Sequence, residues 1–188
     1  MRQHRLRGVL IVLVVLATSA CAAPVPIAQA TPTVRPAAAS YEEYAVAACA
    51  AWDALFRAVG NPDTGTGSDL SRALDAAVAA GDGPSADRAA AAITKELGTG
   101  RQQVAFAAGW VQRAPVMAQV DRIFVAYEAM IAAKRAAALH EPNAVDPQAA
   151  FEQAGGIEAY FAWIAALKAA GLTGAATERQ CPNVPVAP

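Results

Sequence analysis

Apolar residues between positions 41 and 170 recur at the three- and four-residue spacing of amphipathic helices, and no alternating β-strand pattern of useful length appears. The spacing is clearest after Pro115, where Val116, Val120, Ile123 and Phe124 follow one another on one helix face. We therefore expect a chain built from helices alone. The expected helices cover residues 41–59, 69–80, 83–109, 115–135, a short stretch from 147, and 157–170.

Local signals mark the ends of these helices. Ser40 and Glu43 have the spacing of a capping box, and Gly60 followed by a proline at position 62 forbids continuation of the first helix. The third helix should be bent or loosened at 98–100, where two glycines flank a threonine. The pattern predicts an all-α, up-and-down bundle of about four main helices plus short helices, preceded by an N-terminal signal helix and a disordered linker.

The N-terminus has the layout of a secretory signal. Three arginines at positions 2, 5 and 7 precede an apolar run from Gly8 to Ala17, and small residues follow. A membrane-spanning helix needs roughly twenty apolar residues, so a run of about ten is too short for a comfortable permanent anchor. We expect the chain to be exported.

Directly after the apolar run come Ser19, Ala20 and Cys21, and this motif resembles a bacterial lipoprotein precursor, although Thr18 stands where that family usually has leucine. The resemblance implies a diacylglyceryl group on the Cys21 sulfur, cleavage just before Cys21, and a lipid anchor in the cell membrane or envelope. Two alternatives remain open. The general signal peptidase could cut at Ala20–Ala22 or Ala28–Ala30 and release a secreted protein, or the segment could stay as an uncleaved anchor.

The chain therefore divides into four parts. Residues 1–20 are the expected signal peptide, and 21–39 form a proline- and alanine-rich tether without acidic residues. The helical bundle covers 40–171, and 172–188 form a C-terminal tail. The eighteen residues 22–39, if flexible, span about 23 Å, which holds a domain clear of a membrane surface.

The three cysteines, Cys21, Cys49 and Cys181, are an odd number for an oxidising compartment. If Cys21 carries lipid, the other two can pair. We expect a Cys49–Cys181 disulfide that ties the tail to the first helix, and two free thiols are the alternative.

Net charge argues against nucleic acid as a partner. The full chain has a formal charge of −1, and loss of the three signal-peptide arginines leaves 12 basic against 16 acidic residues. A mildly acidic surface does not attract a phosphate backbone.

Candidate chemistry is sparse. The only histidine after the signal peptide, His140, lacks the Glu-x-x-His partners of a di-metal bundle, so we expect no catalytic residue, metal or cofactor. The expectation is a non-enzymatic binding or envelope protein with an unidentified protein or small-molecule partner. The alternative is a small-ligand carrier with a pocket between helices, for which Trp110, Arg57 and Tyr127 are the first candidates.

Overall fold

A computed structural model describes residues 37–61 and 64–171. These residues form six α-helices and one 3-10 turn without a β-strand, so the expected all-α class is confirmed. The elements are α1 (Tyr41–Val59), α2 (Asp69–Ala80), α3 (Gly83–Ala107), η1 (Val111–Arg113), α4 (Ala114–Ala138), α5 (Pro147–Gln153) and α6 (Gly156–Ala169).

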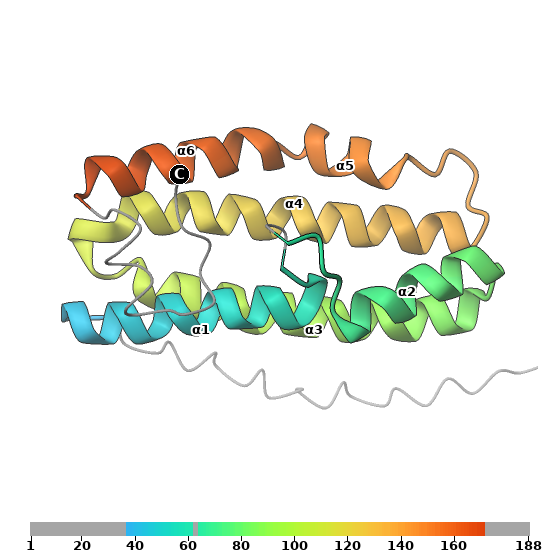
Figure 1. Ribbon diagram of the computed structural model, residues 1–188, viewed down its shortest axis with the longest axis horizontal. Helices are drawn as coiled ribbons and strands as arrows, with labels where there is room; N and C mark the ends of the chain where they lie inside the picture. Colours follow the sequence, from blue (N-terminus) through green and yellow to red (C-terminus); the bar gives the residue numbers. More distant parts are fainter. Residues whose placement is uncertain (1–36, 62–63, 172–188) are drawn as a thin grey trace, which may run out of the picture. The chain divides into compact units, whose positions relative to one another are not determined.

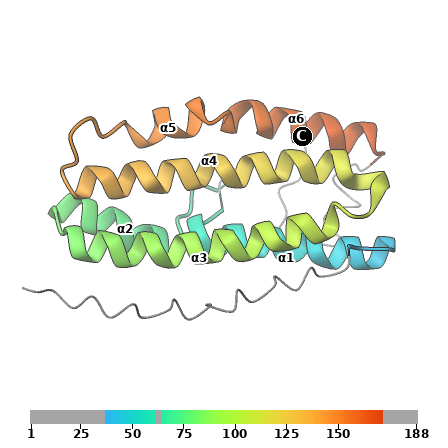
Figure 2. The ribbon, with the colours of Figure 1, turned by 180° about the vertical axis from the view of Figure 1, so that it is seen from behind.

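The helices form four antiparallel legs (Figure 1). Helices α1 and α2 together make the first leg, α3 the second, α4 the third, and α5 with α6 the fourth. Long helices α3 and α4 lie side by side at the centre (Figure 2), where α3 packs on α1 and α2, and α4 packs on α5 and α6. The predicted up-and-down bundle is confirmed, with two of its legs each broken into two helices.

Helix ends follow the local signals closely. The Glu43 backbone N–H donates to Ser40 Oγ at 3.2 Å, and the Ser40 N–H donates back to Glu43 Oε2 at 3.2 Å, which completes the predicted capping box. Gly81 ends α2 with a left-handed φ of 64°, a conformation that glycine adopts without strain.

The expected loosening at residues 98–100 is wrong, because α3 continues through them without a break. Gly100 has a packing role instead. A Cβ atom at this position would lie 2.3 Å from Cε1 of Phe124 on α4. The missing side chain therefore lets the Phe124 ring lie directly against the backbone of α3.

Alanine fills much of the core, and a few large side chains complete it. The largest fully buried ones include Trp163, Phe124 and Leu55. The expected core positions of Trp52 and Trp163 are confirmed, with exposed fractions of 4% and 1%. Their ring centroids lie 4.9 Å apart, so these two indoles bridge α1 and α6, whose backbones hardly approach each other.

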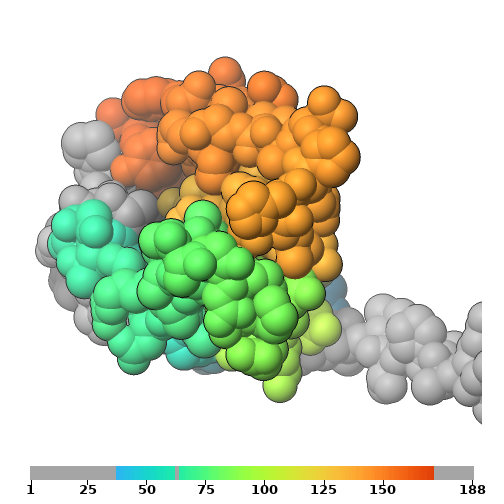
Figure 3. Space-filling model, turned by 90° about the vertical axis from the view of Figure 1, so that its right-hand side faces the viewer, coloured from blue at the N-terminus to red at the C-terminus, as the bar shows by residue number. Residues whose placement is uncertain are grey.

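Ion pairs join the legs at the end of the bundle where α2 turns into α3. Lys134 Nζ lies 2.5 Å from Asp75 Oδ1, and Arg135 Nε lies 2.5 Å from Asp87 Oδ1. Figure 3 shows this end, with α2 and α3 in green beside the α4–α5 connection in orange. Lys134 and Arg135 thus bind carboxylates of neighbouring helices. Their positive charges also interact favourably with the helix dipole near the C-terminus of α4.

At the opposite end of the bundle, the residues just before α1 already pack on the helices. The Ala38 N–H donates to the Phe106 carbonyl at 3.0 Å, and Ala38 is 3% exposed. Ala37 packs on Gly109, where a Cβ atom would lie 1.9 Å from that of Ala37. The packed domain therefore includes residues 37–39, which the sequence assigned to the tether.

The signal peptide, Cys21, the tether up to residue 36, and the tail 172–188 with Cys181 lie outside the described residues. Among the helices that the structure does describe, none combines the length and apolar character needed to cross a membrane.

Candidate functional site

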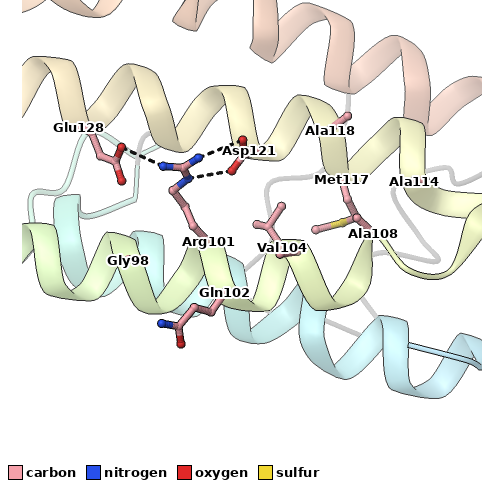
Figure 4. A pocket seen from close by; sticks show the side chains of 11 residues that line it. Gly98, Arg101, Gln102, Val104, Ala108, Ala114, Met117, Ala118, Asp121 and Glu128 are labelled. Carbon is pink, nitrogen blue, oxygen red and sulfur yellow. Dashed lines mark hydrogen bonds and ion pairs between the residues drawn. The ribbon is translucent and has the colours of Figure 1, made fainter. Parts of the chain in front are cut away.

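A groove of about 610 Å³ lies between α3 and α4 (Figure 4). Val104 and Met117 form its apolar floor and are 2% and 1% exposed. Alanines line its sides, and small side chains are what leave the space between the two helices. Its polar end contains Arg101 from α3 and two carboxylates from α4.

The polar end is a three-residue ion network. Arg101 Nε lies 2.8 Å from Asp121 Oδ1, its Nη2 lies 3.3 Å from Asp121 Oδ2, and its Nη1 lies 3.3 Å from Glu128 Oε2. The hydrogen bond to Asp121 is the main cause that raises the pKa of Arg101 above its ordinary value. One fixed cation between two carboxylates leaves the site with a net charge of −1.

Helix geometry brings these three side chains together. Asp121 and Glu128 are seven residues apart on α4, so they lie on one face two turns apart. Arg101 reaches between them from α3. We did not identify these residues from the sequence, although the seven-residue spacing of two acids on an amphipathic helix was a visible signal. The sequence does not show that Arg101 is the partner of these two acids, because that contact depends on how α3 packs against α4.

The groove offers hydrogen-bond acceptors next to an apolar surface. Both carboxylates accept hydrogen bonds from the Arg101 guanidinium, which holds them in place at one end of the groove. They keep acceptor positions for an amide or ammonium group, while Val104 and Met117 offer apolar contact next to them. The groove suits a ligand with an apolar body and a hydrogen-bond donor at one end.

Trp110 lies in a different place, at the end of the bundle where α1 begins. Its ring centroid is 5.2 Å from that of Tyr41 and 5.3 Å from that of Tyr44, and the Arg113 guanidinium carbon lies 5.5 Å from its centroid. Burial raises the pKa of Tyr44 to about 12. Trp110 and these three neighbours form a packed aromatic cap on the bundle end.

The other two residues proposed for a ligand pocket have different neighbours again. Arg57 Nε lies 3.1 Å from Glu96 Oε2 on α3. It follows Tyr44 by thirteen residues, which is about 20 Å along the helix axis. Tyr127 packs on Phe151 of α5 with ring centroids 5.0 Å apart. The structure therefore does not bring Trp110, Arg57 and Tyr127 together.

Cys49 lies half-buried on α1, and its expected partner Cys181 lies outside the described ranges. His140 follows α4 in a left-handed turn with a φ of 53°. Within residues 37–61 and 64–171, no cluster of three or more histidine, cysteine, aspartate or glutamate side chains has the arrangement of a metal site.

Comparison of the chain with protein-family models, with curated proteins and with solved structures finds no match.

Proposed function

We propose that this protein is an exported, lipid-anchored helical domain that acts by non-covalent binding in the cell envelope. The observation that carries the proposal is the order of the N-terminal residues. Arginines, a short apolar run and the sequence Ser19-Ala20-Cys21 follow one another as in a lipoprotein precursor.

The position of the folded domain supports this proposal. Ala37 and Ala38 already pack on the bundle, so the first packed residue is sixteen positions after Cys21. A flexible segment of that length spans about 22 Å. The lipid would therefore attach to the end of the bundle that carries Trp110, with room for the domain to stand clear of the membrane.

Intact-mass measurement tests the anchor. The full chain is expressed in a bacterium, extracted from the membrane fraction in mild detergent, and weighed. We expect a mass that lacks residues 1–20 and includes acyl chains, because two or more chains give stable attachment. Cys21→Ser should abolish the lipid mass, whereas the matched variant Cys49→Ser should keep it. A lipid-free protein cut at one of the two alanine-rich sites would instead make it secreted.

The α3–α4 groove favours a second candidate function, a small-ligand carrier. Its apolar floor and acidic end match an amphipathic cation, for which octylamine is a simple probe. Titration of octylamine into the protein should perturb the amide signals of Arg101, Met117 and Asp121 in an NMR spectrum. Asp121→Asn should weaken that binding, and Asp53→Asn on α1 is the control that should leave it unchanged. Equal binding to all three proteins would exclude the groove as the site.

A further inference from the structure

A flank of α1, beside the face that it buries in the core, carries a second groove. It has a volume of about 530 Å³, and its lining includes Tyr41, Ala45, Cys49 and Asp53. None of the residues that α1 buries in the core is among them. Among the described residues, α1 alone lines this groove.

Cys49 lies on the shoulder of α1 that faces α6. It precedes Trp52 by three residues and Phe56 by seven, so the three side chains share one face of the helix. Trp52 contacts Trp163 of α6 and fixes the direction of that face. Cys49 therefore lies beside the seam between the first and last legs, where the two backbones hardly approach each other.

The end of α6 lies toward the same end of the bundle as Cys49. Because α1 and α6 are antiparallel, α6 ends at the same end of the bundle where α1 begins (Figure 1). Measured from the Trp52–Trp163 contact, Gly171 is eight residues and Cys49 three residues toward that end, or about 12 Å and about 5 Å along the axes. The ten residues from Gly171 to Cys181 reach up to about 33 Å, which is more than this offset along the axes and the width of two helices, each about 10–12 Å across.

The residues after Gly171 suit such a groove chemically. Three prolines at positions 182, 185 and 188 favour an extended chain, which is narrow enough to lie along a helix. Arg179 stands two residues before Cys181, and the groove is bordered by the carboxylates of Glu42 and Asp53. The one cation of residues 172–188 would then lie near two carboxylates, and the one acidic residue of that segment, Glu178, lies next to it in the sequence.

We propose that this groove on the flank of α1 is the docking site of the chain's own residues 172–188, which a disulfide between Cys49 and Cys181 holds in place. In forming the bond, the two thiols lose two protons and two electrons, and a disulfide of an exchanging oxidant such as glutathione disulfide is reduced to two thiols. Formation in the cell rests on the proposed export, because the cytoplasm keeps thiols reduced. Oxidation of the purified chain in vitro does not depend on export.

Peptide mapping tests the covalent link. The full chain, oxidised with glutathione disulfide, is digested without reduction by trypsin and a glutamate-specific protease. We expect a peptide from Tyr44 to Arg57 joined to one that begins at Gln180, and separation of the two after reduction. Free thiols at both positions, a Cys21–Cys49 link, or a link between two chains would each overturn the proposal.

A redox equilibrium tests the docking itself. The ratio of bridged to open chain is measured in mixtures of reduced and oxidised glutathione for Ala45→Glu, which places a charge inside the groove, and for Ala76→Glu, which alters an exposed alanine of α2. We expect Ala45→Glu to lower the ratio about tenfold and Ala76→Glu to leave it unchanged. An equal ratio in both variants would show a bond without a docking site and overturn the proposal.

A change in the tail itself avoids any disturbance of the bundle. Arg179→Glu replaces the expected attraction to Glu42 and Asp53 with repulsion, so it should lower the same ratio. Glu42→Arg in the same chain should restore part of the loss. An Arg179→Glu ratio equal to that of the unmodified chain would contradict the docked position.

Discussion

Trp52 on α1 and Trp163 on α6 lie with their ring centroids 4.9 Å apart, and both indoles are almost fully buried. This contact joins the two legs of the bundle that are furthest apart in the sequence. Because the backbones of α1 and α6 hardly touch, the two side chains supply much of the packing at this seam. Removal of either indole side chain should therefore lower the free energy of unfolding.

Trp163→Ala should lower the free energy of unfolding by about 3–5 kcal/mol, the range for loss of a large buried aromatic side chain. Urea unfolding followed by far-UV circular dichroism measures it. Phe161→Ala is the matched control on the same helix, since Phe161 is 65% exposed and its loss should change stability by less than about 0.5 kcal/mol. Equal losses in the two variants would contradict the assigned packing of α6.

Two glycines of α3 that are two residues apart should respond in opposite directions to alanine. Gly98→Ala meets no atom within 4 Å and should raise stability by about 0.5–1 kcal/mol, because alanine favours a helix more than glycine does. Gly100→Ala places Cβ 2.3 Å from the Phe124 ring and should destabilise the protein despite the same gain in helix propensity. Thermal unfolding of both variants gives the comparison, and a gain in both would exclude close packing of α3 on α4.

The sequence predicts the helix ends, but it does not predict the difference between these two glycines. The ends of α1 and α2 were predictable, because capping side chains and helix-ending glycines act over three or four residues. Gly98 and Gly100 have almost the same local surroundings, and only the approach of Phe124 from another helix distinguishes them. The sequence therefore predicted flexibility where the fold has a close contact.

The sequence did not predict the candidate site between α3 and α4 either, because contacts between two helices form it. Arg101, Asp121 and Glu128 lie on two helices, and their hydrogen bonds depend on the register of α3 against α4. The residues proposed from the sequence were selected by type, as an aromatic corner with nearby charge. In the structure each of them has a separate set of neighbours. Arg57 forms an ion pair with Glu96, and Tyr127 packs on Phe151.

The Arg101 network should contribute little stability and depend on salt. Asp121 and Arg101 side chains are 40% and 39% exposed, and pairs this accessible are usually worth less than about 1 kcal/mol. A double-mutant cycle with Asp121→Asn and Arg101→Met should give a coupling energy of that size in dilute buffer. The coupling should shrink in about 1 M salt, where charges are screened within a few ångströms. A large coupling that salt leaves unchanged would contradict an exposed network.

The phenol of Tyr44 should make the bundle sensitive to alkaline pH. Burial is the main cause that raises its pKa from 10.0 to about 12, because the charged phenolate is disfavoured away from water. A raised pKa in the folded state means that the contribution of Tyr44 to stability is complete below pH 10. It is lost as the pH rises from 10 to about 12, where the unfolded chain releases this proton first.

Tyr44→Phe keeps the ring against Trp110 and removes the ionisable group. The free energy of unfolding of the unmodified protein should therefore fall more steeply between pH 10 and 12 than that of Tyr44→Phe. Tyr160→Phe is the control, since Tyr160 is only partly buried on α6. Urea unfolding at half-unit steps of pH measures the slopes, and absorbance near 295 nm follows ionisation directly. If Tyr44→Phe and the unmodified protein show the same slope, the phenol of Tyr44 is not shielded from water.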